Sequence, residues 1–326
     1  MNKIVLFLRK KLIGENSIEV IAHILEEMFP DIELKVLPEY DNSLKGMIKN
    51  IVFVEKNQGD INHIIYPGGS YLVWFLKGKK IVTWHDVRTL LQSKNIIKRT
   101  LRKLIWIILP NIHSKQSIVC ISNYTADELR KYCPWLRFRI KIIYNPYNAK
   151  IVYKPKIFSQ GYPAILHIGT ATRKNLFRVI KALNGIKCRL IIVGRLSNEL
   201  LLSLQENNSD YTNYCDIDFD KIIDLYKECD IVSFPSLYEG FGVPIVEANA
   251  TGRVVLTSRS ASIPEIASDS AHFVDPYSIQ SIRDGFIKVI TDGTYRESLI
   301  AKGLINARRF TIEKIKQDYE RVYDIV

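Results

Sequence analysis

Short β-branched apolar runs alternate with longer stretches of helical period along most of this 326-residue chain. The runs end at glycine, polar or turn residues, which is typical of βαβ units on a parallel sheet. The pattern predicts strands at Ile4–Leu8, Ile51–Val54, Ile64–Tyr66, Lys80–Thr83, Ser117–Ile121, Ile165–Ile168, Arg189–Val193, Ile231–Phe234, Val254–Thr257 and His272–Val274. We therefore expect an α/β protein with two successive doubly wound, Rossmann-like domains. Such sheets bind ligands at the carboxyl ends of their strands, so a cleft between two facing domains is the expected active site.

Two segments without strand pattern set the predicted domain limits. A stretch near residues 145–162 contains prolines and a glycine but no helical period, and it reads as a linker. We predict an N-terminal domain at residues 1–153 and a C-terminal domain at 154–310. Residues 311–326 show an amphipathic spacing, with Ile312, Ile315, Tyr319 and Val322 on one face. This last helix can pack back on the N-terminal domain.

Composition narrows the class of protein. With 47% hydrophobic and 25% charged residues, the chain resembles a folded globular protein. Its apolar runs are far shorter than the roughly 20 residues of a membrane-spanning helix, and MNKIVLFLRKK reads as a strand rather than a signal peptide. We expect a cytoplasmic protein with reduced cysteines. The six histidines show no zinc-binding spacing, so metal-free chemistry is the simpler assumption.

Positive charge is concentrated in the first half. Residues 1–150 hold 24 Lys and Arg against 13 Asp and Glu, a balance of +11, and the remaining 22 against 21 leave +1 for the second half. This asymmetry predicts an anionic partner for the first half, such as nucleic acid or anionic lipid.

The segment PSLYEGFGVPIVEANATG, Pro235–Gly252, carries the clearest chemical signal. Pro244 suits the first turn of a helix, where its missing N–H costs no hydrogen bond. Backbone N–H groups at Gly242 and Val243, with the positive end of the helix dipole, would bind a phosphate or diphosphate. Glu239 and Glu247 would accept hydrogen bonds from ligand hydroxyls. From these residues alone, a solvated Glu239 and a Glu247 that merely complements the dipole are equally supported.

EGFGVPIVEANATG is similar to the Glu-x7-Glu motif of retaining family 4 glycosyltransferases, which have the GT-B fold. LHIGTATRKNLFRVIKAL, SIPEIASDSAHFVDPYS and ISNYTADEL resemble further segments of that family, in the expected order. The likeness runs from about Ile118 to Phe310. It implies a metal-independent hexosyltransferase that uses a nucleotide-diphosphate sugar as co-substrate, with no cofactor.

The resemblance also implies roles for individual residues of the C-terminal domain. Glu239 would contact hydroxyls of the donor sugar, and Glu247 would contact the ribose. Lys174, with Arg173, would neutralise the leaving diphosphate. The remaining donor-binding candidates lie in the loops at the ends of two strands: Gly169, Thr170, Gly240, Phe241, Gly242 and Val243. Many relatives have arginine where this chain has Thr170, so Arg173 is the expected substitute.

Two candidates belong to the N-terminal domain. His85 follows a predicted strand in TWHD, where the family often has a histidine near the donor sugar. It is the fourth predicted catalytic residue, beside Glu239, Lys174 and Arg173. Gly14, in the loop RKKLIGENS, would let the backbone approach donor or acceptor.

Two further segments have alternative interpretations. CDIDFD resembles a metal-binding DxD or a calcium loop, but Lys221 and Lys227 occupy positions that a calcium loop needs for glycine and glutamate. Asp218 or Asp220 is therefore expected to cap a helix. NIIKRTLRKLIWIIL, Asn95–Leu109, suits an interfacial helix on anionic lipid or an ordinary helix with a solvated basic face, and both interpretations stand equally. No nucleic-acid-binding module is recognisable.

The sequence as a whole predicts a retaining glycosyltransferase acting on a glycan or lipid-linked acceptor, in bacterial surface polysaccharide synthesis. It would be cytoplasmic and peripheral on the inner face of the membrane, bound through its basic N-terminal domain, with no nucleic acid as partner. The alternatives are a GT-B nucleotide-sugar epimerase and a basic protein that binds an anionic polymer.

Overall fold

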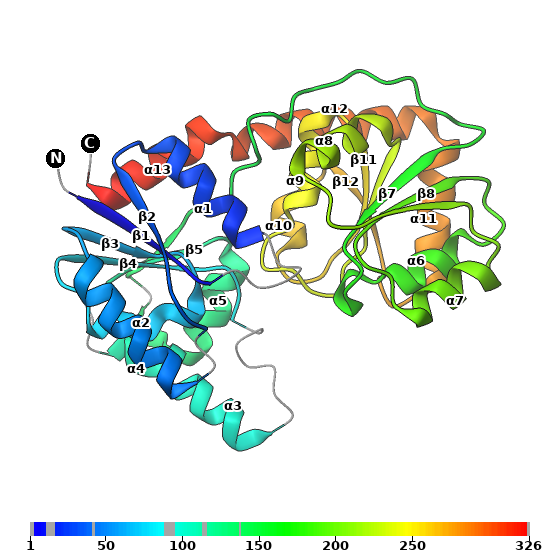
Figure 1. The fold of residues 1–326 in the computed structure, drawn as a ribbon. Coiled ribbons are helices and arrows are strands. Elements are labelled where there is room, and N and C mark those ends of the chain that lie inside the picture. The colour runs from blue at the N-terminus through cyan, green and yellow to red at the C-terminus, as the bar shows by residue number, and fades with distance from the viewer. Residues whose placement is uncertain are drawn as a thin grey trace. The chain divides into compact units, whose positions relative to one another are not determined.

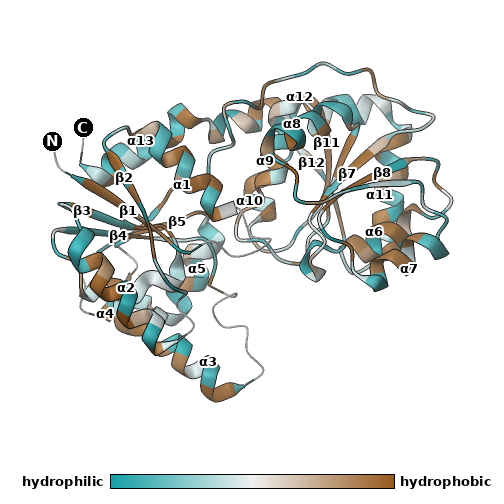
Figure 2. Ribbon diagram, viewed as in Figure 1, coloured by the Kyte–Doolittle hydropathy of each residue, from teal (hydrophilic) through white to brown (hydrophobic). Residues whose placement is uncertain are grey.

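Two parallel sheets organise the structure, a computed structural model that describes residues 3–10, 17–40, 43–87, 95–112, 116–136 and 138–324 (Figure 1). The chain divides into unit 1, Met1–Pro146 with Ile315–Val326, and unit 2, Tyr147–Lys314. Each unit is a Rossmann-like α/β domain whose strands are buried between layers of helices. In Figure 2 the apolar colour accordingly follows the central strands.

In unit 1 the described strands pair in the order β2-β1-β3-β4-β5-β6, all parallel. They are β1 (Ile4–Leu8), β2 (Ile32–Val36), β3 (Ile61–Ile64), β4 (Lys79–Trp84), β5 (Ser117–Cys120) and β6 (Ile140–Ile142). The helical segments are α1 (Ser17–Met28), α2 (Leu44–Asn57), η1 (Pro67–Trp74), α3 (Ile96–Arg102), η3 (Lys103–Ile108), α4 (Leu109–Ile112), α5 (Asn123–Tyr132) and η4 (Pro134–Leu136).

Two predicted strands of unit 1 differ from the structure. The predicted strand Ile64–Tyr66 shares only Ile64 with β3. The run Ile51–Val54 is not a strand but lies inside α2, whose N-terminus is capped by the Ser43 hydroxyl, 3.1 Å from the Gly46 N–H. Burial follows a helical spacing at Gly46, Asn50 and Val54, while Val52 is exposed. A run of four apolar residues fits either period, and here the cap and the helix face decide.

The chain's last helix, α13 (Ile312–Tyr323), closes the core of unit 1. Tyr323 Oη lies 2.8 Å from His63 Nδ1, and His63 Nε2 lies 2.7 Å from Thr83 Oγ1. Burial lowers the pKa of His63 to about 3, so the ring is neutral at pH 7. These buried hydrogen bonds join α13 to β3 and β4.

In unit 2 the described strands pair in the order β12-β11-β10-β7-β8-β9, again all parallel. They are β7 (Ala164–Ile168), β8 (Arg189–Val193), β9 (Tyr211–Tyr214), β10 (Ile231–Phe234), β11 (Val254–Ser258) and β12 (Ala271–Val274). The helical segments are η5 (Thr172–Lys174), α6 (Leu176–Leu183), α7 (Asn198–Glu206), α8 (Phe219–Glu228), α9 (Val243–Thr251), α10 (Ile263–Ala267), α11 (Ile279–Thr291), α12 (Gly293–Ala307) and η6 (Arg308–Phe310).

Alternate residues along the strands of unit 2 face two apolar clusters. Ile165, Ile192 and Leu256 pack with residues of α6, α7 and α11. Leu166 and Val232 pack with residues of α8, α9 and α10. This period-two division follows from the pleat of a strand covered on both faces.

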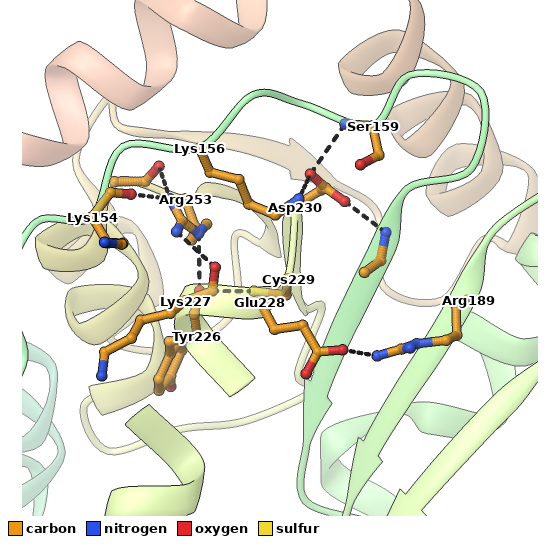
Figure 3. Close-up of polar contacts among 12 residues, drawn as sticks. Lys154, Lys156, Ser159, Arg189, Tyr226, Lys227, Glu228, Cys229, Asp230 and Arg253 are labelled. Carbon is orange, nitrogen blue, oxygen red and sulfur yellow. Dashed lines mark hydrogen bonds and ion pairs between the residues drawn. The ribbon is translucent and has the colours of Figure 1, made fainter. Parts of the chain in front are cut away.

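Residues 147–163 form a segment of unit 2 that precedes β7. Two buried charged residues, Arg253 and Asp230, hold this segment against the rest of unit 2 (Figure 3). Arg253 donates to the carbonyls of Lys154, at 2.9 Å, and of Tyr226, also at 2.9 Å. Asp230 accepts from the N–H groups of Ser159 and Ala164. Because a buried charge needs hydrogen bonds or a counter-charge, these contacts tie the segment firmly to the domain core.

Candidate active site

The loop after β10 ends in a helix N-terminus that no side chain caps. Gly242 has a φ of 114° and precedes α9, with Pro244 in the first turn. A Cβ at Gly242 would lie 3.2 Å from Ile245 Cδ1, so glycine fits both the backbone angle and the space. The N–H groups at the start of a helix carry partial positive charge, and this end of α9 therefore suits an anion.

The loop after β7 is shaped around Lys174. Gly169 has a φ of +97°, and a Cβ there would lie 2.9 Å from Lys174 Cγ. Gly169 is thus what lets the lysine side chain pack against the end of the strand. The turn η5 then carries Arg173 and Lys174, and Asn175 follows in the left-handed conformation with a φ of 67°.

The structure brings three of the predicted catalytic residues together. Arg173 Nη1 donates to Glu239 Oε2 at 2.8 Å, and Lys174 Nζ lies 2.8 Å from Glu239 Oε1. The backbone N–H of Leu237 also donates to the carbonyl of Arg173, at 2.8 Å. The loops after β7 and β10 are therefore linked by side chains and by backbone.

Burial makes this cluster electrostatically unusual. Glu239 is 7% exposed, and the Lys174 ammonium lies over the Phe234 ring, 4.5 Å from its centroid. Burial lowers the pKa of Lys174, and the nearby Glu239 carboxylate opposes that shift. Two cations share one carboxylate, so the cluster carries an excess positive charge beside the N-terminus of α9.

Hydrogen bonds that the sequence analysis did not predict hold the Glu239 loop in place. Asn175 Nδ2 donates to the carbonyls of Pro235 and Pro276, at 3.0 and 2.7 Å. Ser262 Oγ contacts the carbonyls of Glu239 and Phe241, at 2.9 and 3.0 Å. Ser262 lies in SIPEIASDS, part of a segment that resembles the glycosyltransferase family. For Asn175, the only sequence signal is its place directly after Lys174.

Glu247 has a different partner. Tyr226 Oη donates to Glu247 Oε2 at 2.7 Å, and both side chains are buried. Burial raises the pKa of Glu247 to about 7, although the Tyr226 hydrogen bond acts in the opposite direction. Arg253, in turn, binds the carbonyl of Tyr226 (Figure 3). The sequence did not predict Tyr226 or Arg253, which come from other elements.

The remaining donor-binding candidates of unit 2 have structural contacts of their own. Phe241 is 3% exposed and meets Phe310 edge to face, with 5.6 Å between ring centroids. Thr170 Oγ1 donates to the carbonyl of Arg195 at 2.7 Å. Gly240 is half-buried, and Val243 is the first residue of α9.

Of the two candidates in unit 1, the structure describes one. His85 follows β4, and its Nε2 donates to the Ile65 carbonyl at 2.8 Å. Burial lowers the pKa of His85 to about 4, so the ring is neutral at pH 7 and its Nδ1 is an acceptor. Gly14 lies outside the described residues.

The three aspartates of the acidic run, Asp216, Asp218 and Asp220, each have a different partner. Asp218 caps α8, accepting from the Lys221 N–H at 2.7 Å, which confirms the predicted cap. Asp216 pairs with Arg195 and Asp220 with Lys150. Within the described part of the chain, no group of three His, Cys, Asp or Glu residues could hold a metal ion.

The chain is similar in sequence to known glycosyltransferases. Residues 152–304 match the family model for glycosyl transferases group 1. The chain is 24% identical over 292 residues to the O-antigen chain mannosyltransferase B of Escherichia coli, covering 82% of this chain and 76% of that protein. These matches support a glycosyltransferase.

Two further proteins extend the comparison. N,N'-diacetylbacillosaminyl-diphospho-undecaprenol alpha-1,3-N-acetylgalactosaminyltransferase of Campylobacter jejuni is 23% identical over 222 residues, covering 66% of this chain and 57% of that protein. The crystal structure of HepE of Anabaena in complex with UDP-glucose superposes with a TM-score of 0.82 at 14% identity, over 100% of both chains. The fold is GT-B. None of the described helices is long and apolar enough to cross a membrane.

Proposed function

We propose that this protein is a retaining glycosyltransferase of family 4, which moves a hexosyl group from a nucleotide-diphosphate sugar to a glycan or lipid-linked acceptor. The observation that carries the proposal is the cluster of Arg173, Lys174 and Glu239 beside the uncapped N-terminus of α9. The negative charge of a diphosphate would balance the excess positive charge of this cluster. The hydroxyls of a sugar would donate hydrogen bonds to the carboxylate.

In the proposed complex the diphosphate replaces Glu239 as the ion-pair partner of the two cations. Arg173 and Lys174 bind phosphate oxygens, together with the N–H groups at Gly242 and Val243. Glu239 is then released to accept hydrogen bonds from hydroxyls of the donor sugar, and Glu247 accepts from the ribose. Before the ligand binds, Glu239 balances the charge of the two cations and holds them in position. Glu239 therefore also prepares the cations for the diphosphate.

The proposed chemistry needs no attacking carboxylate. The bond between the anomeric carbon and the phosphate oxygen breaks, and a bond from the acceptor oxygen to the same face of that carbon forms. The acceptor's proton passes to the departing phosphate oxygen. Lys174 and Arg173 stabilise the charge that builds on this oxygen, which is the main catalytic contribution, and they replace a metal ion in that role.

The proposed acceptor lies at an anionic membrane surface, and unit 1 would bind that surface. Ile96, Ile97 and Leu101 are 68%, 78% and 53% exposed on α3, a helix with no buried residue. Lys98 and Arg99 are exposed on the same helix. Apolar side chains enter the interface of a bilayer while each basic residue near an anionic surface adds about 1 kcal/mol.

The named relatives support the class of acceptor. One acts on an O-antigen chain and another on a diphospho-undecaprenol, as their names state. These names support a role in bacterial surface polysaccharide synthesis. We propose that the protein acts in the cytoplasm, peripheral on the inner face of the membrane.

Turnover of a panel of UDP- and GDP-sugars tests the proposal, with release of the nucleoside diphosphate as the readout. Lys174→Ala and Glu239→Gln should each lower turnover at least about 100-fold, as removal of a charge-stabilising donor does in other enzymes. Lys227→Ala is the control, because this lysine pairs with Asp224 at the surface. Wild-type turnover by either folded site variant, or no turnover of any nucleotide sugar by the wild type, would contradict the proposal.

A further inference from the structure

The carboxyl group of Glu247 is held at one of its two oxygens. Its Oε2 accepts from Tyr226 Oη at 2.7 Å, and the Glu247 and Tyr226 side chains are 6% and 0% exposed. Within the described residues, no further hydrogen bond reaches this carboxyl group. Glu247 Oε1 is not one of the oxygens that are buried without a hydrogen bond, so it stays accessible to solvent. Oε1 is therefore the carboxyl oxygen that a ligand hydroxyl can reach.

Tyr226 is a fixed point in the core of unit 2. It lies in the last turn of α8 and packs in one apolar cluster with Val232, Ile245 and other buried residues. Arg253 donates to the carbonyls of Tyr226 and Lys227, at 2.9 and 3.0 Å, and so holds the end of this helix (Figure 3). A tyrosine ring has few rotatable bonds, and close packing in a core restricts them further.

Glu247 benefits from such a fixed point because its own side chain is long and flexible. It projects from α9, whereas Tyr226 projects from α8, so the hydrogen bond joins two helices of the domain. A hydrogen bond to Oε2 fixes the plane of the carboxyl group and, with it, the direction in which Oε1 can accept. A ligand-binding group is placed precisely when side chains on rigid elements hold it in this way.

The same hydrogen bond favours the charged form of the carboxyl group. Burial raises the pKa of Glu247 to about 7, and the Tyr226 hydrogen bond lowers it. Burial also raises the pKa of Tyr226 well above its usual range, and the Glu247 carboxylate adds to that shift, so the hydroxyl remains a donor. Without this donor, more of Glu247 would be protonated at neutral pH, and a neutral carboxyl group is the weaker acceptor.

We infer that Tyr226 is a positioning residue for donor binding, which orients the Glu247 carboxylate so that Oε1 accepts from a hydroxyl of the donor's ribose. The inference rests on the proposed function, in which Glu247 contacts the ribose. Tyr226 itself does not touch the ligand, because its side chain is buried and its single hydroxyl proton is donated to Glu247.

Nucleoside diphosphates with and without ribose hydroxyls test this role. UDP, GDP and their 2′,3′-dideoxy analogues are titrated by calorimetry into the wild type and into Tyr226→Phe. The members of a pair share base and diphosphate, so the ratio of their Kd values reports on the ribose hydroxyls alone. With the base that it recognises, the wild type should bind the ribose form about 10- to 100-fold more tightly, the usual effect of hydrogen bonds to a charged group. Tyr226→Phe should lower this ratio at least about 5-fold.

Further variants separate positioning from a general loss of structure. Tyr295→Phe removes another tyrosine hydroxyl of unit 2, which lies 3.0 Å from His272 Nδ1, and it should keep the wild-type ratio. Glu247→Met removes both carboxyl oxygens and should lower the ratio by itself. Adding Tyr226→Phe to Glu247→Met should change the ratio little, because Tyr226 acts through the carboxylate.

Several results would overturn the inference while the proposed function stands. They are a wild type that binds a nucleoside diphosphate without preferring the ribose form, an unchanged ratio in Tyr226→Phe, an equal fall in Tyr295→Phe, and a further fall when Tyr226→Phe is added to Glu247→Met. Failure of the proposed function would look different. In that case the wild type would bind none of the nucleotides and turn over no nucleotide sugar, and the inference would fall with it.

Discussion

Glu247→Gln should make the stability of unit 2 less dependent on pH. Burial raises the pKa of Glu247 from 4.5 to about 7 in the folded protein. Between these pH values the folded state binds a proton that the unfolded chain has released, so stability falls as the pH rises through this window. The pKa difference corresponds to about 3 kcal/mol of stability lost above pH 7. Glutamine cannot ionise, and its carbonyl can still accept from Tyr226.

The variant and the wild type should therefore be about equally stable near pH 4.5, and the variant should be the more stable protein at pH 8. At roughly 2–4 °C per kcal/mol for a domain of about 150–250 residues, the midpoint difference at pH 8 is roughly 6–12 °C. Calorimetry from pH 4.5 to 8 measures it. All four tryptophans lie in unit 1, at positions 74, 84, 106 and 135, so their fluorescence follows that unit separately.

Glu206→Gln serves as the control for this measurement, because Glu206 is exposed at the end of α7. Its midpoint difference from the wild type should not change with pH. A difference for Glu247→Gln that stays constant from pH 4.5 to 8, or that favours the wild type at high pH, would refute the argument from burial.

Further predictions follow from the proposed function and from the loop geometry. Transfer should survive EDTA, because Lys174 and Arg173 hold the diphosphate; complete loss that Mn²⁺ restores would instead implicate a metal. NMR of the product from an α-linked donor should show an α linkage, and a β linkage would exclude retention. Lys98→Gln with Arg99→Gln should weaken sedimentation with anionic liposomes. Salt should weaken wild-type binding because the Debye length falls from about 10 Å at 0.1 M to about 3 Å at 1 M. Equal binding of both proteins to anionic and neutral vesicles would count against the membrane proposal. Gly169→Ala should cost at least about 1 kcal/mol of stability and displace Lys174, and unchanged stability and turnover would contradict the role of the +97° φ.

Local chemistry explains why the sequence alone could predict the two loops at the proposed donor site. Gly242 and Pro244 act on their own backbone, so their places at the start of α9 follow from residue type. Strands such as β8 and β10 lie at their predicted bounds because an apolar run of this length between turn residues leaves few alternatives. The strands β2, β6 and β9 were not predicted. Residues 32–36 of β2 are mostly half-buried, so their hydrophobic signal is weak.

The partners of the charged residues, by contrast, were decided only by the tertiary structure. Arg173 and Glu239 are 66 positions apart, and Tyr226 and Glu247 are 21 apart, so neither contact is visible in a local pattern. Sequence determined the α/β fold and the glycine and proline positions that shape its loops, because backbone preference is local. The pKa of Glu247 and the charge balance around Glu239 depend on burial and on distance between side chains, which exist only once the chain has folded.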